Sequence, residues 1–123
     1  MYWSPARSAV VTYAAAFGLQ AIDMVHIDFQ DIESLRKESR EGAQMAFAGK
    51  QVIHPNQVAP VQECFTPSDE AITNALHILE AFEKCQQEGI GAFAMDGKMI
   101  DAPIVKAAER VLALARVAGK LSK

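Results

Sequence analysis

Cysteine, long apolar runs and an excess of one charge are all scarce in this chain, and each scarcity excludes a class of protein. The two cysteines, Cys64 and Cys85, are too few for a disulfide scaffold, and their spacing matches no zinc-binding pattern. We therefore expect two free thiols in a reducing compartment. No apolar run approaches the roughly 20 residues of a membrane-spanning helix.

The charge balance argues against a strongly charged partner. The formal net charge is −3 and the sequence pI is near 5.6, so nothing predicts binding to nucleic acid or to an anionic membrane. The first ten residues contain one arginine and no apolar core of signal-peptide length, so no targeting segment is visible. Half of the 123 residues are hydrophobic and 22% are charged, which is typical of a globular domain.

The first half of the chain alternates helical and extended patterns. The predicted elements are a helix over residues 4–17, a strand over 21–27, a helix over 32–48 and a strand over 50–53. Ser4 and Pro5 suit the cap and first turn of the first helix, and Gly49 suits the end of the second. The apolar face of the first helix consists of Ala6, Ala9, Val10, Tyr13, Ala14 and Phe17. This order predicts a parallel β–α–β unit.

The second half has the pattern of helices around a hairpin. A short helix follows Asn56, and Thr66–Asp69 form a capping box for a longer helix. Asp96-Gly97 between two short apolar segments is a strong hairpin signal, and a last helix begins near Pro103. The apolar face of the longer helix consists of Ile72, Ala75, Leu76, Leu79 and Phe82. The change of pattern predicts a boundary between residues 65 and 67.

Two parallel strands are too few for a covered sheet. A parallel sheet is stable when both faces are covered, and such sheets normally have more strands. Residues 1–65 therefore indicate the last turns of a larger α/β barrel. The alternative is a small complete domain with a two-stranded core, whose exposed edges would invite association.

Three stretches carry a resemblance to a known family. They are FGLQAIDMVHIDFQD (17–31), GKQVIHPNQV (49–58) with FTPS after it (65–68), and GAFAMDGKMIDAPIVKAAERVL (91–112). They resemble the citrate lyase beta / malyl-CoA lyase family, and within it the animal citrate lyase beta-like branch. The most specific part is G-K-x-x-I-H-P-x-Q followed by F-T-P-S, to which the hairpin with M-I-D-x-P adds.

The resemblance implies a fold and an assembly. The family has a (β/α)₈ TIM barrel with a C-terminal extension, so residues 1–65 would be the last two β/α units. Residues 66–123 would be a C-terminal lid made of a helix, a hairpin and a helix. Family members form oligomers, often trimers, in which the lid of one subunit covers the active site of its neighbour. The animal branch implies a mitochondrial location.

The resemblance also implies an activity. The family are magnesium-dependent carbon–carbon lyases that cleave a 3-hydroxyacyl-CoA thioester, such as citramalyl-CoA, into acetyl-CoA and a keto acid, such as pyruvate. A divalent cation stabilises the forming keto acid, and a positioned acid or base handles the proton of the enolate carbon. The family's magnesium ligands lie on earlier strands that this sequence does not contain. We therefore expect these 123 residues alone to be inactive.

Two other functions stay open. One is a non-catalytic module that acts through oligomerisation, with its lid docked on complete subunits. The other is a malate-synthase-like condensation followed by thioester hydrolysis in the complete enzyme, a reaction that requires an activated water. No residue of this sequence decides between them.

Asp101 is the candidate catalytic residue. Met99-Ile100-Asp101-Ala102-Pro103 matches the family's M-I-D-x-P motif, which carries the lid aspartate. The same residue, two positions before Pro103, also suits the N-cap of the last helix. The residue type fits both roles.

The candidate substrate and CoA contacts lie around the two predicted strands. They are Asp23, Ile53, His54 and Pro55. Asp23 lies inside a buried strand, where a carboxylate needs a partner, so it either lines the barrel near the substrate or pairs with a basic side chain. His54 is either a structural hydrogen-bonder or a ligand contact, and the resemblance places this segment at the CoA-binding mouth.

The remaining polar residues are predicted to be structural. Asp28 and Asp31 are expected to be loop carboxylates rather than a metal pair. His26 and His77 have no metal-type partner nearby in the sequence, so we expect them to be packing or surface residues. The basic residues of the second predicted helix, Arg36, Lys37 and Arg40, are expected to form a solvated face.

Overall fold

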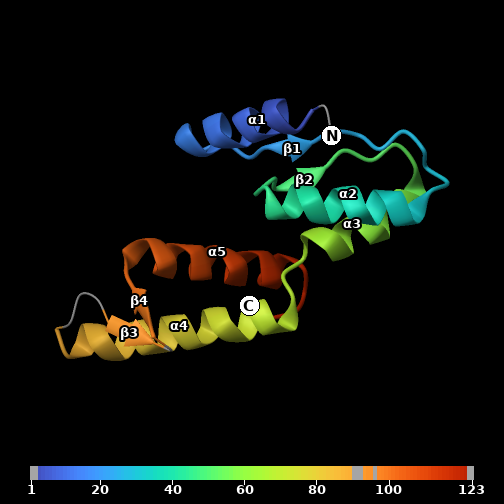
Figure 1. Ribbon diagram of the computed structural model, residues 1–123. Coiled ribbons are helices and arrows are strands. Elements are labelled where there is room, and N and C mark those ends of the chain that lie inside the picture. The colour runs from blue at the N-terminus through green and yellow to red at the C-terminus, as the bar shows by residue number, and fades with distance from the viewer. Residues whose placement is uncertain (1–2, 90–92, 96, 122–123) are drawn as a thin grey trace. The chain divides into compact units, whose positions relative to one another are not determined.

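The structure is a computed structural model that describes residues 3–89, 93–95 and 97–121 (Figure 1). It divides into two compact units, residues 1–65 and 66–123, here called the N-terminal unit and the C-terminal unit. Each is described by itself. No helix among the described residues is long and apolar enough to cross a membrane.

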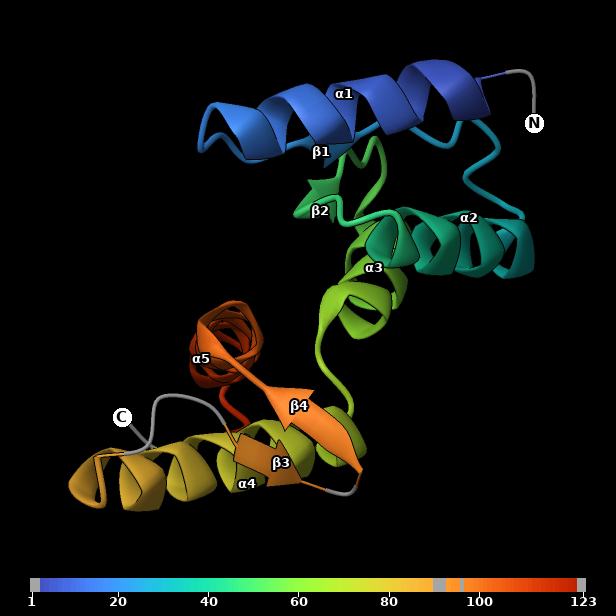
Figure 2. The same cartoon turned by 60° about the vertical axis from the view of Figure 1, so that its left-hand side comes forward.

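The N-terminal unit is a β–α–β unit with flanking helices. Its elements are α1 (Ser4–Ala16), β1 (Ile22–Asp23), α2 (Ile32–Gln44), β2 (Gly49–Lys50), the 3₁₀ helix η1 (Pro55–Gln57) and α3 (Val58–Phe65). In both ribbon views α1 lies beside β1, whereas α2 and α3 lie beside β2 (Figures 1 and 2). The strands pair in parallel, with Ile22 opposite Gly49 and Asp23 opposite Lys50, which confirms the predicted pairing.

The two strands are much shorter than predicted. Two residues of each strand pair, although 21–27 and 50–53 have extended patterns. Beyond them the backbone bonds to side chains instead: the carbonyl of Met24 accepts from Lys50 Nζ at 2.7 Å, and Ile53 N–H donates to Gln57 Oε1 at 2.9 Å. At the carboxyl ends of both strands, hydrogen bonds to side chains thus replace the backbone hydrogen bonds of a longer sheet.

The boundaries of α1 and α2 differ from the prediction. Trp3, not Ser4, is the N-cap of α1, and Pro5 lies in its first turn. Helix α2 ends at Gln44 rather than running to Gly49. Ala46 has a φ of 74°, and Phe47 N–H donates to Gly42 O at 3.0 Å, the hydrogen-bond pattern of a Schellman motif. A left-handed alanine therefore ends the helix where glycine was expected.

The predicted apolar face of α1 is not buried in the N-terminal unit. Among the residues of this helix, all of which the structure describes, none is buried. Val10 and Tyr13 are 52% and 67% exposed, and Phe17, just past the helix, is 75% exposed. The apolar spacing predicted the helix correctly, but the N-terminal unit offers no surface that covers that face.

The C-terminal unit is a helix, a hairpin and a helix, as predicted. It contains α4 (Asp69–Gln87), β3 (Phe93–Met95), β4 (Lys98–Ile100) and α5 (Ala102–Val117), and the antiparallel hairpin connects the two helices (Figure 2). Gly97 in the turn has a φ of 75°, whereas Asp96 lies outside the described residues. The cap of α4 is Ser68, whose Oγ accepts from Ala71 N–H at 3.1 Å, and Pro67 precedes the helix rather than starting it.

The core of the C-terminal unit joins α4, α5 and the hairpin. Leu112 and Ala115 are 2% and 0% exposed. Leu76, predicted to face the core, is 43% exposed, while Ile78 is buried. The buried members of this core are Ile72, Ala75, Ile78, Ile100, Val105, Ala108, Leu112 and Ala115.

Candidate functional site

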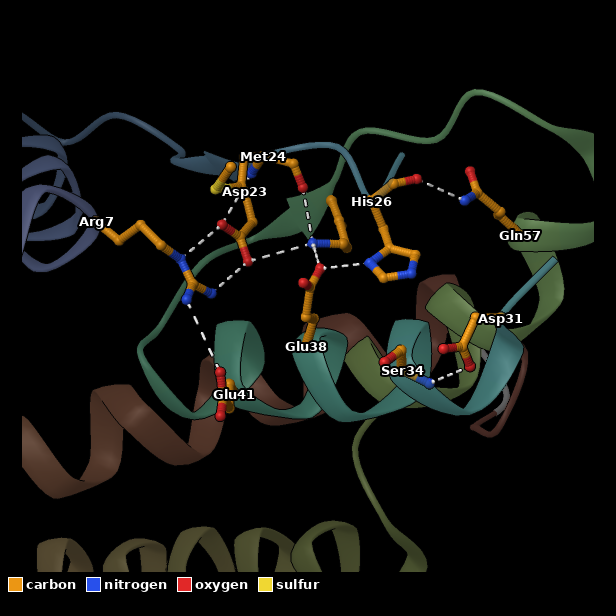
Figure 3. A network of polar contacts seen from close by, with 10 residues as sticks. Arg7, Asp23, Met24, His26, Asp31, Ser34, Glu38, Glu41 and Gln57 are labelled. Atoms are coloured by element: carbon orange, nitrogen blue, oxygen red, sulfur yellow. Dashed lines mark hydrogen bonds and ion pairs between the residues drawn. The ribbon is translucent and has the colours of Figure 1, made fainter. Parts of the chain in front are cut away.

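A buried network of charges lies at the carboxyl ends of β1 and β2 (Figure 3). Asp23 and Lys50 are opposite each other in the parallel register, and their side chains are 0% and 1% exposed. Lys50 Nζ lies 3.8 Å from Asp23 Oδ2 and 3.3 Å from Glu38 Oε2. The buried ammonium is therefore compensated by carboxylates from β1 and α2.

Arg7 of α1 bonds to both oxygens of the Asp23 carboxylate. Nε donates to Oδ1 at 3.0 Å and Nη2 donates to Oδ2 at 2.7 Å, the bidentate geometry in which such pairs are strongest (Figure 3). Its guanidinium also lies 3.9 Å from Glu41 Oε2 and 5.6 Å from the centroid of the Phe47 ring. The hydrogen bonds to Asp23, with the charges of Asp23 and Glu41, raise the pKa of Arg7 above its ordinary value.

The structure shows one of the two roles left open for Asp23. Its carboxylate pairs with a basic side chain, and Oδ1 also accepts from Met24 N–H at 2.8 Å. A Cβ on Gly42 would come within 2.5 Å of Asp23 Oδ2, so α2 approaches the carboxylate as closely as a glycine allows. Asp23 is thus fully buried and enclosed by protein groups.

The network reaches the loop after β1 through His26. Its Nδ1 lies 3.0 Å from Glu38 Oε2, while its Nε2 is buried without a hydrogen-bond partner among the described residues. His26 was predicted to be a packing or surface residue without a metal-type partner nearby in the sequence, and its polar partner in the structure, Glu38, lies twelve positions away on α2. The distance in sequence hid the contact.

Two amide side chains join the loops that follow β1 and β2. Gln57 is fully buried, and its Nε2 donates to His26 O at 3.0 Å (Figure 3). Its Oε1 accepts from Ile53 N–H. Asn56 Nδ2 donates to Phe29 O at 3.0 Å. Sequence analysis missed both residues, although both lie within the I-H-P-x-Q run.

An exposed rim stands on these two loops, formed by Phe29 and residues 53–55. The rings of Phe29 and His54 are stacked, with centroids 4.8 Å apart and planes 9° from parallel. His54 Nδ1 accepts from Asn56 N–H at 3.2 Å and so caps η1. Ile53, His54 and Pro55, the predicted CoA contacts, are all exposed here. In folds with parallel strands, ligands usually bind at the carboxyl ends of the strands, which is where this rim lies.

One cavity beside the network does not include the rim. It has a volume of about 260 Å³ and lies between α1 and α2, beside Arg7 and Lys50. Its lining combines three cationic residues with Glu38 and Glu41, so the charges nearly balance. The net formal charge of this lining is +1, and two of its cations, Arg7 and Lys50, already pair with carboxylates.

Asp101 caps α5 in the C-terminal unit. Its Oδ1 accepts from Ile104 N–H at 3.3 Å, and the residue is exposed. Among the described residues its other carboxylate oxygen has no hydrogen-bond partner. The predicted capping role is therefore present in the structure, and it leaves one oxygen free to act on a ligand.

The other predicted carboxylates have local structural roles. Asp31 Oδ1 accepts from Ser34 N–H at 3.1 Å and caps α2, and Asp28 Oδ1 accepts from Gln30 N–H at 3.2 Å. The described part of the chain contains no group of three or more His, Cys, Asp or Glu residues that could hold a metal ion. The donors present therefore do not form a magnesium site.

The remaining polar predictions concern the surface. Arg36 pairs with Glu63 of α3, and this hydrogen bond raises the pKa of Arg36. Lys37 and Arg40 are exposed, as expected of a solvated face, and so is His77. Both cysteines are free thiols, as predicted.

Comparison with known proteins agrees with this architecture. The family model described as C-C Bond Lyase of the TIM-Barrel fold matches residues 7–120. The chain belongs to this family. It is 54% identical over 110 residues to the mitochondrial citramalyl-CoA lyase of Rattus norvegicus and 56% identical to that of Homo sapiens. Each match covers 89% of this chain and 32% of the relative, so the chain spans about a third of their length.

A solved structure gives the corresponding match in three dimensions. The protein CitE of Mycobacterium tuberculosis, in complex with magnesium, acetoacetate and coenzyme A, matches with a TM-score of 0.74 at 37% sequence identity. The match covers 89% of this chain and 40% of that one. The chain is therefore a mixed α/β member of a family of lyases with the TIM-barrel fold.

Proposed function

We propose that the chain forms part of the active site of a magnesium-dependent acyl-CoA carbon–carbon lyase that cleaves citramalyl-CoA into acetyl-CoA and pyruvate. The observation that carries this proposal is the 54–56% identity to citramalyl-CoA lyases over 110 of the 123 residues. A match of that length includes both the rim and Asp101. By the same likeness, the complete enzyme would act in mitochondria.

Residues 1–65 are proposed to be the last two β/α units of the barrel, and residues 66–123 its lid. The parallel pairing of β1 and β2 and the loops at their carboxyl ends support the first assignment. The helix–hairpin–helix order of the C-terminal unit supports the second. In an oligomer such as a homotrimer, the lid would cover the site of a neighbouring subunit.

Asp101 is proposed to deliver the proton that completes the reaction. When the bond between the carbinol carbon and the thioester α-carbon breaks, the hydroxyl passes its proton to a base from the rest of the complete enzyme and becomes the keto group of pyruvate. The bonding electrons pass to the thioester enolate, whose carbon then takes a proton to give acetyl-CoA. A carboxyl at Asp101 supplies that proton, and the free oxygen beside its capping bond is the atom that can do so.

The rim is proposed to hold coenzyme A. Ile53, His54 and Pro55 are exposed at the carboxyl ends of the strands, and the stacked Phe29 fixes the orientation of His54. Asp23 has no free oxygen to offer a ligand, so its proposed role is to support the rim from beneath. Magnesium does not fit the described donors, because the carboxylates of Asp23 and Asp31 are already bonded to protein groups. Its ligands would come from the rest of the complete enzyme.

The test replaces the matched third of human citramalyl-CoA lyase with this sequence and measures acetyl-CoA release from citramalyl-CoA and malyl-CoA with Mg²⁺. We expect the chimera to be active, and the 123 residues alone to be inactive. Asp101→Asn should lower kcat by about 10²- to 10⁴-fold. Glu109→Gln, an exposed substitution on the same helix, should not.

Three results would contradict the proposal. A folded chimera that releases no acetyl-CoA would favour the non-catalytic module. Full activity of Asp101→Asn would remove Asp101 from the proton transfer. Turnover by the 123 residues alone would show that the missing part of the barrel is dispensable.

A further inference from the structure

Gln57 is a fully buried polar side chain whose two functional groups bond to two different loops. Its amide nitrogen donates to the carbonyl of His26, in the loop after β1, at 3.0 Å. Its amide oxygen accepts from the backbone N–H of Ile53, in the loop after β2, at 2.9 Å. A primary amide is the uncharged side chain that offers both a donor and an acceptor at this length. The site therefore uses both properties of Gln57.

These bonds fix the spacing between the halves of the rim. His26 O and Phe29 O belong to the same loop, and they accept from Gln57 and Asn56, respectively. In the sequence, His54 lies between Ile53 and the two amide residues, and its ring stacks on that of Phe29. A shift of either loop would break a buried hydrogen bond, which costs more than breaking an exposed one.

We propose that Gln57 is a positioning residue that sets the rim in the arrangement that binds coenzyme A. The inference rests on the proposed function, because it takes the rim to be the CoA contact. Gln57 touches no reacting atom, since it is fully buried beneath the rim. Its substitution should therefore act on binding of the substrate and leave the chemical step unchanged.

The substitution Gln57→Glu tests the positioning role, because the hydrogen bond to His26 O is lost when the new carboxyl is ionised and restored when it is protonated. A protonated carboxyl can still donate to His26 O and accept from Ile53 N–H, whereas the carboxylate has no donor and repels the carbonyl. Burial disfavours the charged form of a carboxyl and so raises its pKa toward the range in which the enzyme is assayed. The variant should resemble the wild type at low pH and differ from it at high pH.

The measurement is KM and kcat for citramalyl-CoA in the active chimera, each divided by the wild-type value at the same pH. We expect the KM of Gln57→Glu to be about tenfold raised near pH 8.5 and to return toward the wild-type value near pH 6, with kcat unchanged. Gln30→Glu adds the same charge to the loop after β1 at an exposed position and should leave KM unchanged at both pH values.

Three outcomes would overturn the inference: a KM ratio near one at both pH values, a kcat that falls while KM rises, or an equal rise in KM for Gln30→Glu.

An inactive wild-type chimera would instead contradict the proposed function. NMR of the 123-residue chain then decides the positioning role. Nuclear Overhauser contacts between the Phe29 and His54 rings should be lost in Gln57→Glu near pH 8.5 and kept near pH 6. Contacts kept at both pH values would overturn it.

Discussion

Arg7 of α1 donates to both carboxylate oxygens of Asp23 in β1, at 3.0 and 2.7 Å, and this pair attaches a helix that buries none of its own residues. The same guanidinium lies over the Phe47 ring and near Glu41. Since the apolar face of α1 is exposed within the N-terminal unit, the attachment of this helix is mainly electrostatic. The Asp23 side chain is fully buried and the Arg7 side chain is 15% exposed, so removing Arg7 leaves a buried charge that has lost its bidentate partner.

Asp23→Asn is therefore expected to destabilise the chain severely. The substitution keeps the shape of the side chain but leaves Arg7 and Lys50 without their shared anion. We expect the free energy of unfolding to fall by about 3 kcal/mol, measured by urea denaturation. Glu63→Gln, which removes the partner of the more exposed Arg36, should leave it nearly unchanged. Equal effects of the two substitutions would show that burial of the Asp23 pair has no energetic consequence.

The contribution of Arg7 to stability should not depend on pH in the neutral range. Its pKa is raised in the folded state, chiefly by its hydrogen bonds to Asp23. A raised pKa stabilises the fold below the pKa of the unfolded state and loses that effect as pH rises through the folded value, which for arginine lies far above the neutral range. The difference in unfolding free energy between wild type and Arg7→Met should be constant between about pH 6 and pH 9. A steady change across this range would mean that another group controls the pair.

Gly42→Ala should destabilise the chain although it adds alanine to a helix. In an exposed helix interior this substitution stabilises by about 1 kcal/mol. At position 42 the new Cβ would meet Asp23 Oδ2 at 2.5 Å, so α2 or the carboxylate must move. We expect a loss of about 1 to 3 kcal/mol in urea denaturation. Gly49→Ala, whose Cβ would meet its nearest atom at 3.8 Å, is the matched control and should be tolerated.

Local signals predicted the elements of this fold better than their boundaries or their partners. The hairpin of β3 and β4 was predictable because its signal is local, a turn sequence between two short apolar segments, and Gly97 has the positive φ that such a turn favours. The length of the strands was not predictable from local signals. Their pairing stops where Lys50 Nζ donates a hydrogen bond to the carbonyl of Met24, and these two residues are 26 positions apart in the sequence. The end of α2 was also missed, since alanine rarely adopts the left-handed conformation that Ala46 has.

The candidate site divides in the same way. The I-H-P-x-Q run pointed to Ile53, His54 and Pro55, which do stand together on the rim. The remaining rim residue, Phe29, and the carbonyl of His26 that bonds to Gln57 come from the loop after β1. A buried glutamine leaves no periodic pattern in the sequence, and its role depends on which loops its amide nitrogen and amide oxygen contact. Only a structure could show that role.

Magnesium should not stabilise the 123 residues alone. Asp31 and Asp101 cap helices and Asp23 pairs with a basic side chain, and the described residues contain no group of three or more His, Cys, Asp or Glu residues that could hold a metal ion. A ligand stabilises a fold only when it binds the folded state, so about 5 mM MgCl₂ should not raise the urea midpoint. Chelation of the metal should nevertheless abolish acetyl-CoA release by the active chimera. A midpoint that rises with Mg²⁺ would indicate a site outside the described residues or one formed on binding.

Asp101 has a capping bond that can be separated from its proposed role in proton transfer. Asn is as good an N-cap as Asp, so Asp101→Asn should keep the bond to Ile104 N–H and the stability of the chain. Asp101→Ala removes the cap and should cost about 0.5 to 2 kcal/mol in urea denaturation. Ser68→Ala, which removes the cap of α4, should have a similar effect on stability.

The activities of the three variants in the chimera then separate the two roles of Asp101. If Asp101 transfers the proton, Asp101→Asn loses activity although the protein is as stable as wild type. Ser68→Ala keeps activity although it is less stable, because Ser68 has no part in the chemistry. If Asp101 only caps α5, the order is reversed: Asp101→Asn stays active, and the activity of Asp101→Ala declines only as far as its fraction of folded protein does.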